Sequence, residues 1–122
     1  IQFLMPSYPI INPEAIEILR SLNPGDSDEF LKEIVGIFIE DTPLRIADLD
    51  TSLHDGDKER FIRAAHSIKG SSANLGALAL RSVAEKLEHH SNTVGLSDVS
   101  EMITEIKAHF DLVKIELSKI TG

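Results

Sequence analysis

Apolar residues recur at intervals of three and four along most of the chain, which is the period of helices that bury one face. The clearest stretch follows Ser97, which is expected to cap a last helix, and its apolar residues are Val99, Ile103, Ile106, Phe110, Val113, Leu117 and Ile120. This spacing is typical of a bundle core. No strand-like alternation, internal repeat or low-complexity tract appears anywhere in the sequence.

Two helices are predicted in the first half of the chain. Asn12 and Pro13 form a good helix start, and a short helix from there to about Leu22 should bury Ile16, Leu19 and Ile18. After the break at 23–25, one of the residues Asp26, Ser27 and Asp28 should cap a second helix. Its expected inner face consists of Phe30, Leu31, Ile34, Phe38, Leu49 and Leu53. Pro43 should bend this helix without ending it, because the apolar pattern resumes with Leu44.

Two further helices follow a tight turn at residues 54–57, where Gly56 can end one helix and Asp57 can cap the next. The third helix is predicted over Lys58 to Asn74, and Gly76 separates it from the fourth. Their expected inward positions are Phe61, Ala65, Ile68, Ser72 and Leu75, and then Leu80, Val83, Ala84 and Leu87.

These elements predict an all-α fold, an antiparallel up-and-down four-helix bundle with a short additional N-terminal helix. The domain should span residues 13–122, preceded by an N-terminal arm or non-native remnant at residues 1–12, in which Met5 is a possible native start. The long apolar seam of the last helix would also suit a dimerising coiled coil. Three other amphipathic helices need a partner face, however, and therefore favour the intramolecular bundle and a monomer.

The composition excludes several classes of function. A net charge of −8 disfavours binding to nucleic acid or anionic membranes, and no apolar run is long enough to span a bilayer. Cysteine is absent, which removes disulfides, thiolate metal sites and cysteine nucleophiles. We expect a protein without direct membrane insertion, and the lack of cysteine suits the cytoplasm.

His66 is the candidate for chemistry. At about 100° per residue it lies about 140° round the third helix from Phe61, so its side chain should face water. Gly70 and Ala73 fall beside it at the i+4 and i+7 positions, and Lys69 lies on the flank. Glycine in a helix interior is about 1 kcal/mol less favourable than alanine, so the presence of Gly70 inside this helix requires an explanation. An exposed imidazole with small neighbours and a nearby cation can act as a nucleophile toward phosphorus on a partner protein.

The segment around His66 resembles the phosphohistidine helix of histidine phosphotransfer (HPt) domains, whose pattern is roughly A-H-x-[LI]-K-G-[SA]-[SA]-x-x-[LIF]-G. The matching residues are Ala65-His66-Ser67-Ile68-Lys69-Gly70-Ser71-Ser72-Ala73-Asn74-Leu75-Gly76. The resemblance implies that His66 is phosphorylated, that Lys69 assists the phosphoryl group, and that Gly70 makes room for a docking receiver domain. Arg63 and Ala73 are further expected docking residues. The pair Ser71-Ser72 looks more like multistep phosphorelay modules than like chemotaxis kinases.

The resemblance also implies partners. These are response-regulator receiver domains and a hybrid sensor kinase, with no cofactor on this chain and magnesium on the receiver. The module is then a cytoplasmic phosphocarrier without an ATP site, or the cytoplasmic part of a membrane sensor kinase, in which case a transferase label would apply. The alternative function is a non-catalytic helical adaptor.

Other candidate sites are weaker. Glu85 and His89 share a helical face and, with Glu88 and His90, could hold zinc, but the H-E-x-x-H pairing is missing. A calcium loop around residues 48–57 lacks its required glycine. Ser71 and Ser72 have no acid–base partners nearby in sequence, so packing or capping roles are expected.

Overall fold

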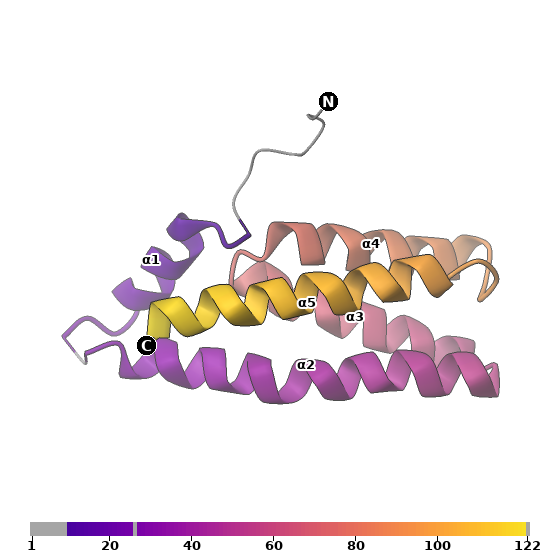
Figure 1. Ribbon diagram of the computed structural model, residues 1–122, viewed down its shortest axis with the longest axis horizontal. Coiled ribbons are helices and arrows are strands. Elements are labelled where there is room, and N and C mark those ends of the chain that lie inside the picture. Colours follow the sequence, from indigo (N-terminus) through magenta and orange to yellow (C-terminus); the bar gives the residue numbers. More distant parts are fainter. Residues whose placement is uncertain (1–9, 26, 122) are drawn as a thin grey trace, which may run out of the picture.

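The computed structural model describes residues 10–25 and 27–121, and the regular elements of this part are all helices. These are α1 (Pro13–Ser21), α2 (Glu29–Asp55), α3 (Lys58–Asn74), α4 (Leu78–Thr93) and α5 (Ser100–Thr121). Figure 1 shows α2 to α5 side by side as a bundle, with α1 at the end where α2 begins and α5 ends. The predicted all-helical bundle with an additional N-terminal helix is confirmed. Of the predicted arm, residues 1–9 lie outside the described residues, and Ile11 is buried.

The order of packing places α3 and α5 at opposite corners of the bundle. Each of these two helices packs against both α2 and α4. The outer face of α3, which carries His66, therefore points away from the outer face of α5. A partner can reach α3 without contacting α5.

The core follows the helical period most closely in α3, α4 and α5. All nine predicted inward positions of α3 and α4 are buried, and so are the predicted positions of the last helix except Ile120, which is partly buried. In the first two helices the prediction was wrong at Ile18, which is 62% exposed. Leu44, which was not assigned to the inner face, is 57% exposed. It also missed core positions of α2, namely Val35, Thr42, Ile46 and Ser52. The helix itself runs through Pro43 without a break, as expected.

Two of the predicted helix starts are confirmed by their caps. The Asn12 side chain accepts a hydrogen bond from the backbone N–H of Glu14 at 3.1 Å, and Asp57 accepts one from the N–H of Arg60 at 3.2 Å. Gly56 ends α2 with a φ of 69°. That left-handed conformation suits glycine, since it carries no Cβ.

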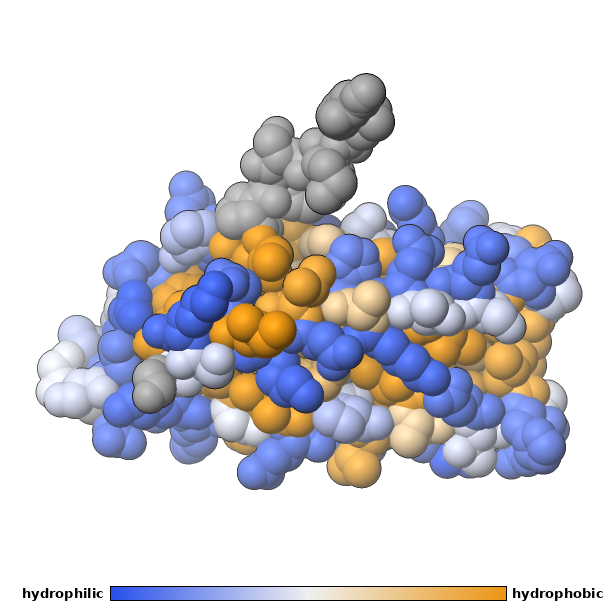
Figure 2. Space-filling view, viewed as in Figure 1, coloured by the Kyte–Doolittle hydropathy of each residue, from blue (hydrophilic) through white to orange (hydrophobic). Residues whose placement is uncertain are grey.

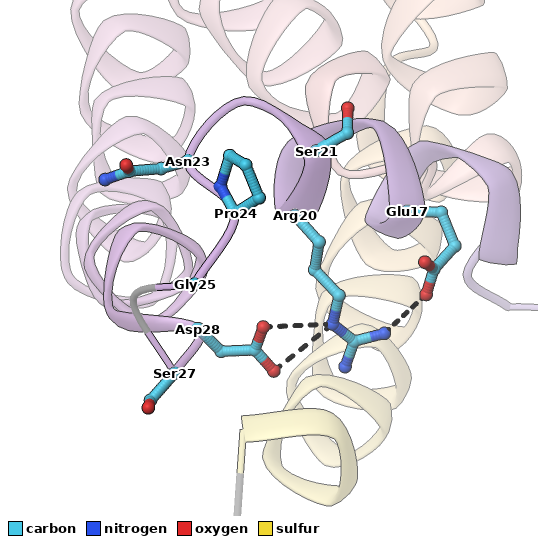
Figure 3. A pocket seen from close by; sticks show the side chains of 8 residues that line it. All are labelled: Glu17, Arg20, Ser21, Asn23, Pro24, Gly25, Ser27 and Asp28. Atoms are coloured by element: carbon cyan, nitrogen blue, oxygen red, sulfur yellow. Dashed lines mark hydrogen bonds and ion pairs between the residues drawn. The ribbon is translucent and has the colours of Figure 1, made fainter.

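Two other predicted caps, Asp28 and Ser97, make no capping hydrogen bond; Asp26, an alternative to Asp28, lies outside the described residues. Asp28 immediately precedes α2 but has a φ of 65°, and its carboxylate makes no capping bond. It binds Arg20 instead (Figure 3), whose Nε donates to both carboxylate oxygens at 3.2 and 3.3 Å while Nη1 donates to Glu17 at 2.6 Å. These bonds tie α1 to the start of α2. Ser97 does not cap α5, because this helix begins at Ser100. The carbonyl oxygen of Ser97 instead lies 2.7 Å from Nε2 of His90.

Candidate functional site

The imidazole of His66 projects from the middle of α3 into solvent. Its side chain is 65% exposed, whereas Ala65 and Ile68 on the opposite side of the helix are completely buried. The buried residues fix the rotation of α3, and this fixes the direction of His66. The exposed placement that the helical period predicted is confirmed.

Glu88 of α4 connects His66 to Lys69. One carboxylate oxygen, Oε2, lies 2.8 Å from Nδ1 of His66, and the other, Oε1, lies 2.7 Å from Nζ of Lys69. An ionised carboxylate can only accept hydrogen bonds, so this contact assigns the proton of the neutral ring to Nδ1. The lone pair of Nε2 is then free to act as a nucleophile.

The charge of Glu88 follows from its surroundings. Partial burial alone would raise the pKa of this carboxyl, but hydrogen bonds from Lys69 and His66 outweigh burial and hold the pKa below its ordinary value. Glu88 is therefore ionised at neutral pH. A negative charge beside Nδ1 stabilises the positive charge that develops on the ring when Nε2 forms a new bond.

Small side chains clear the approach to His66. Gly70 and Ala73 are exposed on the same side of α3, and a Cβ at Gly70 would meet no atom within 4 Å. Gly70 therefore does not serve close packing within the chain. Arg63, the third expected docking residue, is also exposed, one helical turn before His66. The structure brings all five predicted site residues to one side of the bundle.

An apolar surface borders this side on α2. A hollow of about 150 Å³ between α2 and α3 is lined by Ile34, Ile37, Phe38, Asp41, Thr42, Ser71, Asn74 and Leu75. Ile37 is 58% exposed, and Leu44, two turns further along α2, is 57% exposed. Exposed apolar side chains grouped in this way are common where another protein binds.

The weaker candidates of the sequence take other roles. No group of three or more potential metal-ligating residues occurs in the described part of the chain, and Glu88 is already bound to His66 and Lys69. The hydroxyls of Ser71 and Ser72 both donate to the carbonyl of Ile68, at 3.3 and 2.6 Å. Within residues 10–25 and 27–121, no helix has the length and hydrophobicity needed to cross a membrane.

The role of Glu88 was missed, because it was considered only as a metal ligand. A signal for it exists in the sequence. In an antiparallel pair of helices, residues at equal distances from the turn lie side by side, and His66 and Glu88 are equally far from Ala77, which immediately precedes α4. A carboxylate at this register is the one that can reach the ring.

Comparisons with known proteins identify the relatives of this chain. Residues 33–115 match the family model described as Hpt domain. A curated relative, multistep phosphorelay regulator 1 of Schizosaccharomyces pombe, is 30% identical over 111 residues, which are 91% of this chain but only 37% of that protein.

Two solved structures share the fold. Histidine-containing phosphotransfer protein B of Pseudomonas aeruginosa PAO1 superposes with a TM-score of 0.84 at 25% identity, over 94% of this chain and 96% of that one. The HPT domain of a Shewanella sensor hybrid histidine kinase gives a TM-score of 0.70 at 15% identity, over 91% of this chain and 92% of that one. The match of the family model covers most of the bundle, and we conclude that this chain belongs to the Hpt domain family.

Proposed function

We propose that His66 is the residue through which this histidine phosphotransfer domain carries phosphate. Its Nε2 attacks the phosphorus of a receiver's phosphoaspartate, a P–N bond forms, and the aspartate leaves as a carboxylate. In the second step a carboxylate oxygen of another receiver attacks the same phosphorus and the P–N bond breaks. The proton on Nδ1 stays in place in both steps, and Glu88 balances the positive charge of the phosphorylated ring.

One observation carries this proposal. The ring is exposed, and its Nδ1 is held by a carboxylate, so that the free nitrogen Nε2 can face a partner. Lys69 supports it, since an ammonium group next to the ring can stabilise the charge of the transferring phosphoryl oxygens. A single lysine supplies only part of the cationic surroundings that the transfer needs, and magnesium on the receiver would supply the rest.

The receiver would dock over the exposed side of α3 and the neighbouring face of α2. Gly70 and Ala73 allow its active site to approach His66, Arg63 lies at the border, and Ile37 and Leu44 offer apolar contacts on α2. We propose that the donor and acceptor are cytoplasmic response-regulator receivers and that a hybrid sensor kinase supplies the phosphate. Whether the chain is separate from that kinase or part of it, it carries phosphate without an ATP site of its own.

The test is label transfer from a panel of phosphorylated receiver domains. Wild-type chain should gain a label that is labile in acid and stable in base, as expected of a phosphohistidine. His66→Gln should gain none while keeping its helicity and melting temperature, since exposed polar substitutions usually change stability by no more than about 0.5 kcal/mol. His54→Gln, a change at an exposed histidine at the end of α2, is the matched control and should be labelled like wild type.

Two results would contradict the proposal. The first is label on the His66→Gln variant at the wild-type level. The second is binding of receivers without any label on the wild-type chain, which would favour the adaptor function. ATP and magnesium without a receiver should leave the wild-type chain unlabelled.

A further inference from the structure

A second hollow between α2 and α3 is rich in arginine side chains. Its volume is about 330 Å³, and it is lined by Arg45, Asp48, Arg60, Arg63, Ala64 and Ser67. Three of the five arginines of the sequence meet here, although the whole chain has a net charge of −8. Most of the arginines of the chain therefore lie at one place in a molecule that is acidic overall.

The acidic residues nearby hold two of these arginines in place. Asp48 binds Nη2 of Arg60 at 2.7 Å through one oxygen and Nη1 of Arg45 at 3.2 Å through the other. Asp41 lies 3.7 Å from Nε of Arg45, which is too long for a hydrogen bond. The hollow is therefore built around a fixed Arg60–Asp48–Arg45 arrangement.

Two donor groups of the hollow remain unused. Nε of Arg45 is a buried atom without a hydrogen-bond partner. Arg63 takes part in none of the hydrogen bonds or ion pairs found among the described residues. Arg45 and Arg60 both bind Asp48, whereas the guanidinium group of Arg63 binds no carboxylate among the described residues.

The hollow lies directly beside His66. Arg63 precedes His66 by one helical turn and Ser67 follows it, so a protein that covers the imidazole also covers the rim of the hollow. Arginine is well suited to such a place, because its planar guanidinium group binds carboxylates through paired hydrogen bonds.

We propose that this hollow is an anchoring site for one carboxylate side chain, an aspartate or glutamate on the surface of the docked receiver domain. Arg63 donates to the carboxylate, and Ser67 offers its hydroxyl. The carboxylate fixes the orientation of the receiver on α3. Receivers that carry a carboxylate at this place should bind more tightly than receivers that lack one. This inference rests on the proposed function, since it assigns the partner of the same surface.

The first test compares charge reversals at matched positions, with the receiver that labels the wild-type chain fastest. Arg63→Glu should raise the receiver concentration needed for half-maximal labelling by about tenfold at low salt, and Arg63→Gln by less. The difference should shrink as salt is added. Lys114→Glu changes the net charge equally but lies on α5, at the opposite corner of the bundle, and should leave labelling close to wild type. Equal effects of Arg63→Glu and Lys114→Glu would overturn the proposal.

A second test identifies the carboxylate itself. Each exposed aspartate and glutamate of that receiver, outside its own active site, is changed to lysine. One of these changes should weaken labelling of the wild-type chain and restore labelling of Arg63→Glu. Failure of every change to restore it would overturn the proposal while leaving the phosphotransfer role of His66 intact.

A third measurement does not depend on phosphotransfer. Acetate is titrated at constant ionic strength while the Nε–Hε signals of the arginines are followed by NMR. The signal of Arg63 should shift more than that of Arg81, an exposed arginine on α4. Equal shifts of the two signals would overturn the anion site, whereas a selective shift of the Arg63 signal would support it even if no receiver labelled the chain. Arg63→Glu and Arg63→Gln should melt like wild type, because Arg63 has no ion pair to lose among the described residues.

Discussion

The carboxylate of Glu88 lies between the imidazole of His66 and the ammonium of Lys69, so each of these side chains restricts the other two. Because these contacts lower the pKa of Glu88, the carboxylate stabilises the fold in its ionised form. This contribution should be fully present above the ordinary glutamate pKa of about 4.3 and should be lost as the pH falls through the lowered value.

Glu88→Gln should therefore be less stable than wild type at pH 7 by at most about 1 kcal/mol, since the ion pair is partly exposed. This difference in stability should disappear in strong acid. It is measured from melting curves of both proteins between pH 7 and pH 2. The control is Glu85→Gln, a change at an exposed glutamate one turn earlier. A deficit that grows on acidification would contradict this account of Glu88.

Lys69 can act on the phosphoryl group only if its ammonium reaches beyond Glu88. Lys69→Ala should slow transfer about tenfold or more, and should weaken receiver binding much less, if the ammonium stabilises charge that develops during transfer. Single-turnover rates at saturating receiver, together with binding titrations, separate the two effects. Lys86→Ala, at an exposed lysine of α4, is the control. Equal losses in rate and in affinity would make Lys69 a docking residue.

At the scale of the helix, Gly70 places stability and function in opposition. The residue lies inside α3 with open space around its Cβ position. Gly70→Gln should therefore raise stability by up to about 1 kcal/mol through helix propensity. Its side chain would also stand beside His66, where the proposed docking requires a receiver to come close, so transfer should fall steeply.

Gly36→Gln separates these two effects. Gly36 also lies inside a helix with open space around it, and it sits about 160° round α2 from Ile34, which lines the groove toward α3. The Gly36→Gln variant should gain similar stability and should transfer phosphate normally. Thermal melting and transfer rates, measured on one preparation of each variant, test both expectations. Normal transfer by Gly70→Gln would show that the approach to His66 does not need a glycine.

The helices also show how far the sequence could predict the structure. The inward positions of α3 followed directly from its period, because only one face of that helix is apolar. In α2 apolar residues occur on two faces, one in the core and one toward solvent, so the pattern could not show that Leu44 points outward. Glu88 could not be assigned from the pattern of α4 alone, since its role depends on the register between two helices.

At the scale of the whole molecule, Gly76 connects the N-terminal helix to the end of the bundle. The N–H of Asn12 donates to the carbonyl of Gly76 at 2.8 Å, and Gly76 has a φ of +71°. A Cβ at this position would lie 2.7 Å from Cβ of Ala15 and 3.0 Å from Cβ of Asn12. The glycine is therefore required both by its own conformation and by the close approach of α1.

Gly76→Ala should consequently lower the stability by more than the cost of a left-handed conformation alone. Gly56→Ala measures that cost, because Gly56 has a similar φ of +69° and nothing within 4 Å of its Cβ position. We expect a loss of about 1–2 kcal/mol for Gly56→Ala, and a larger loss for Gly76→Ala, because α1 must shift away from the turn. Chemical denaturation of both variants measures the difference. Equal losses would show that α1 adapts without cost, and that Gly76 serves only the turn between α3 and α4.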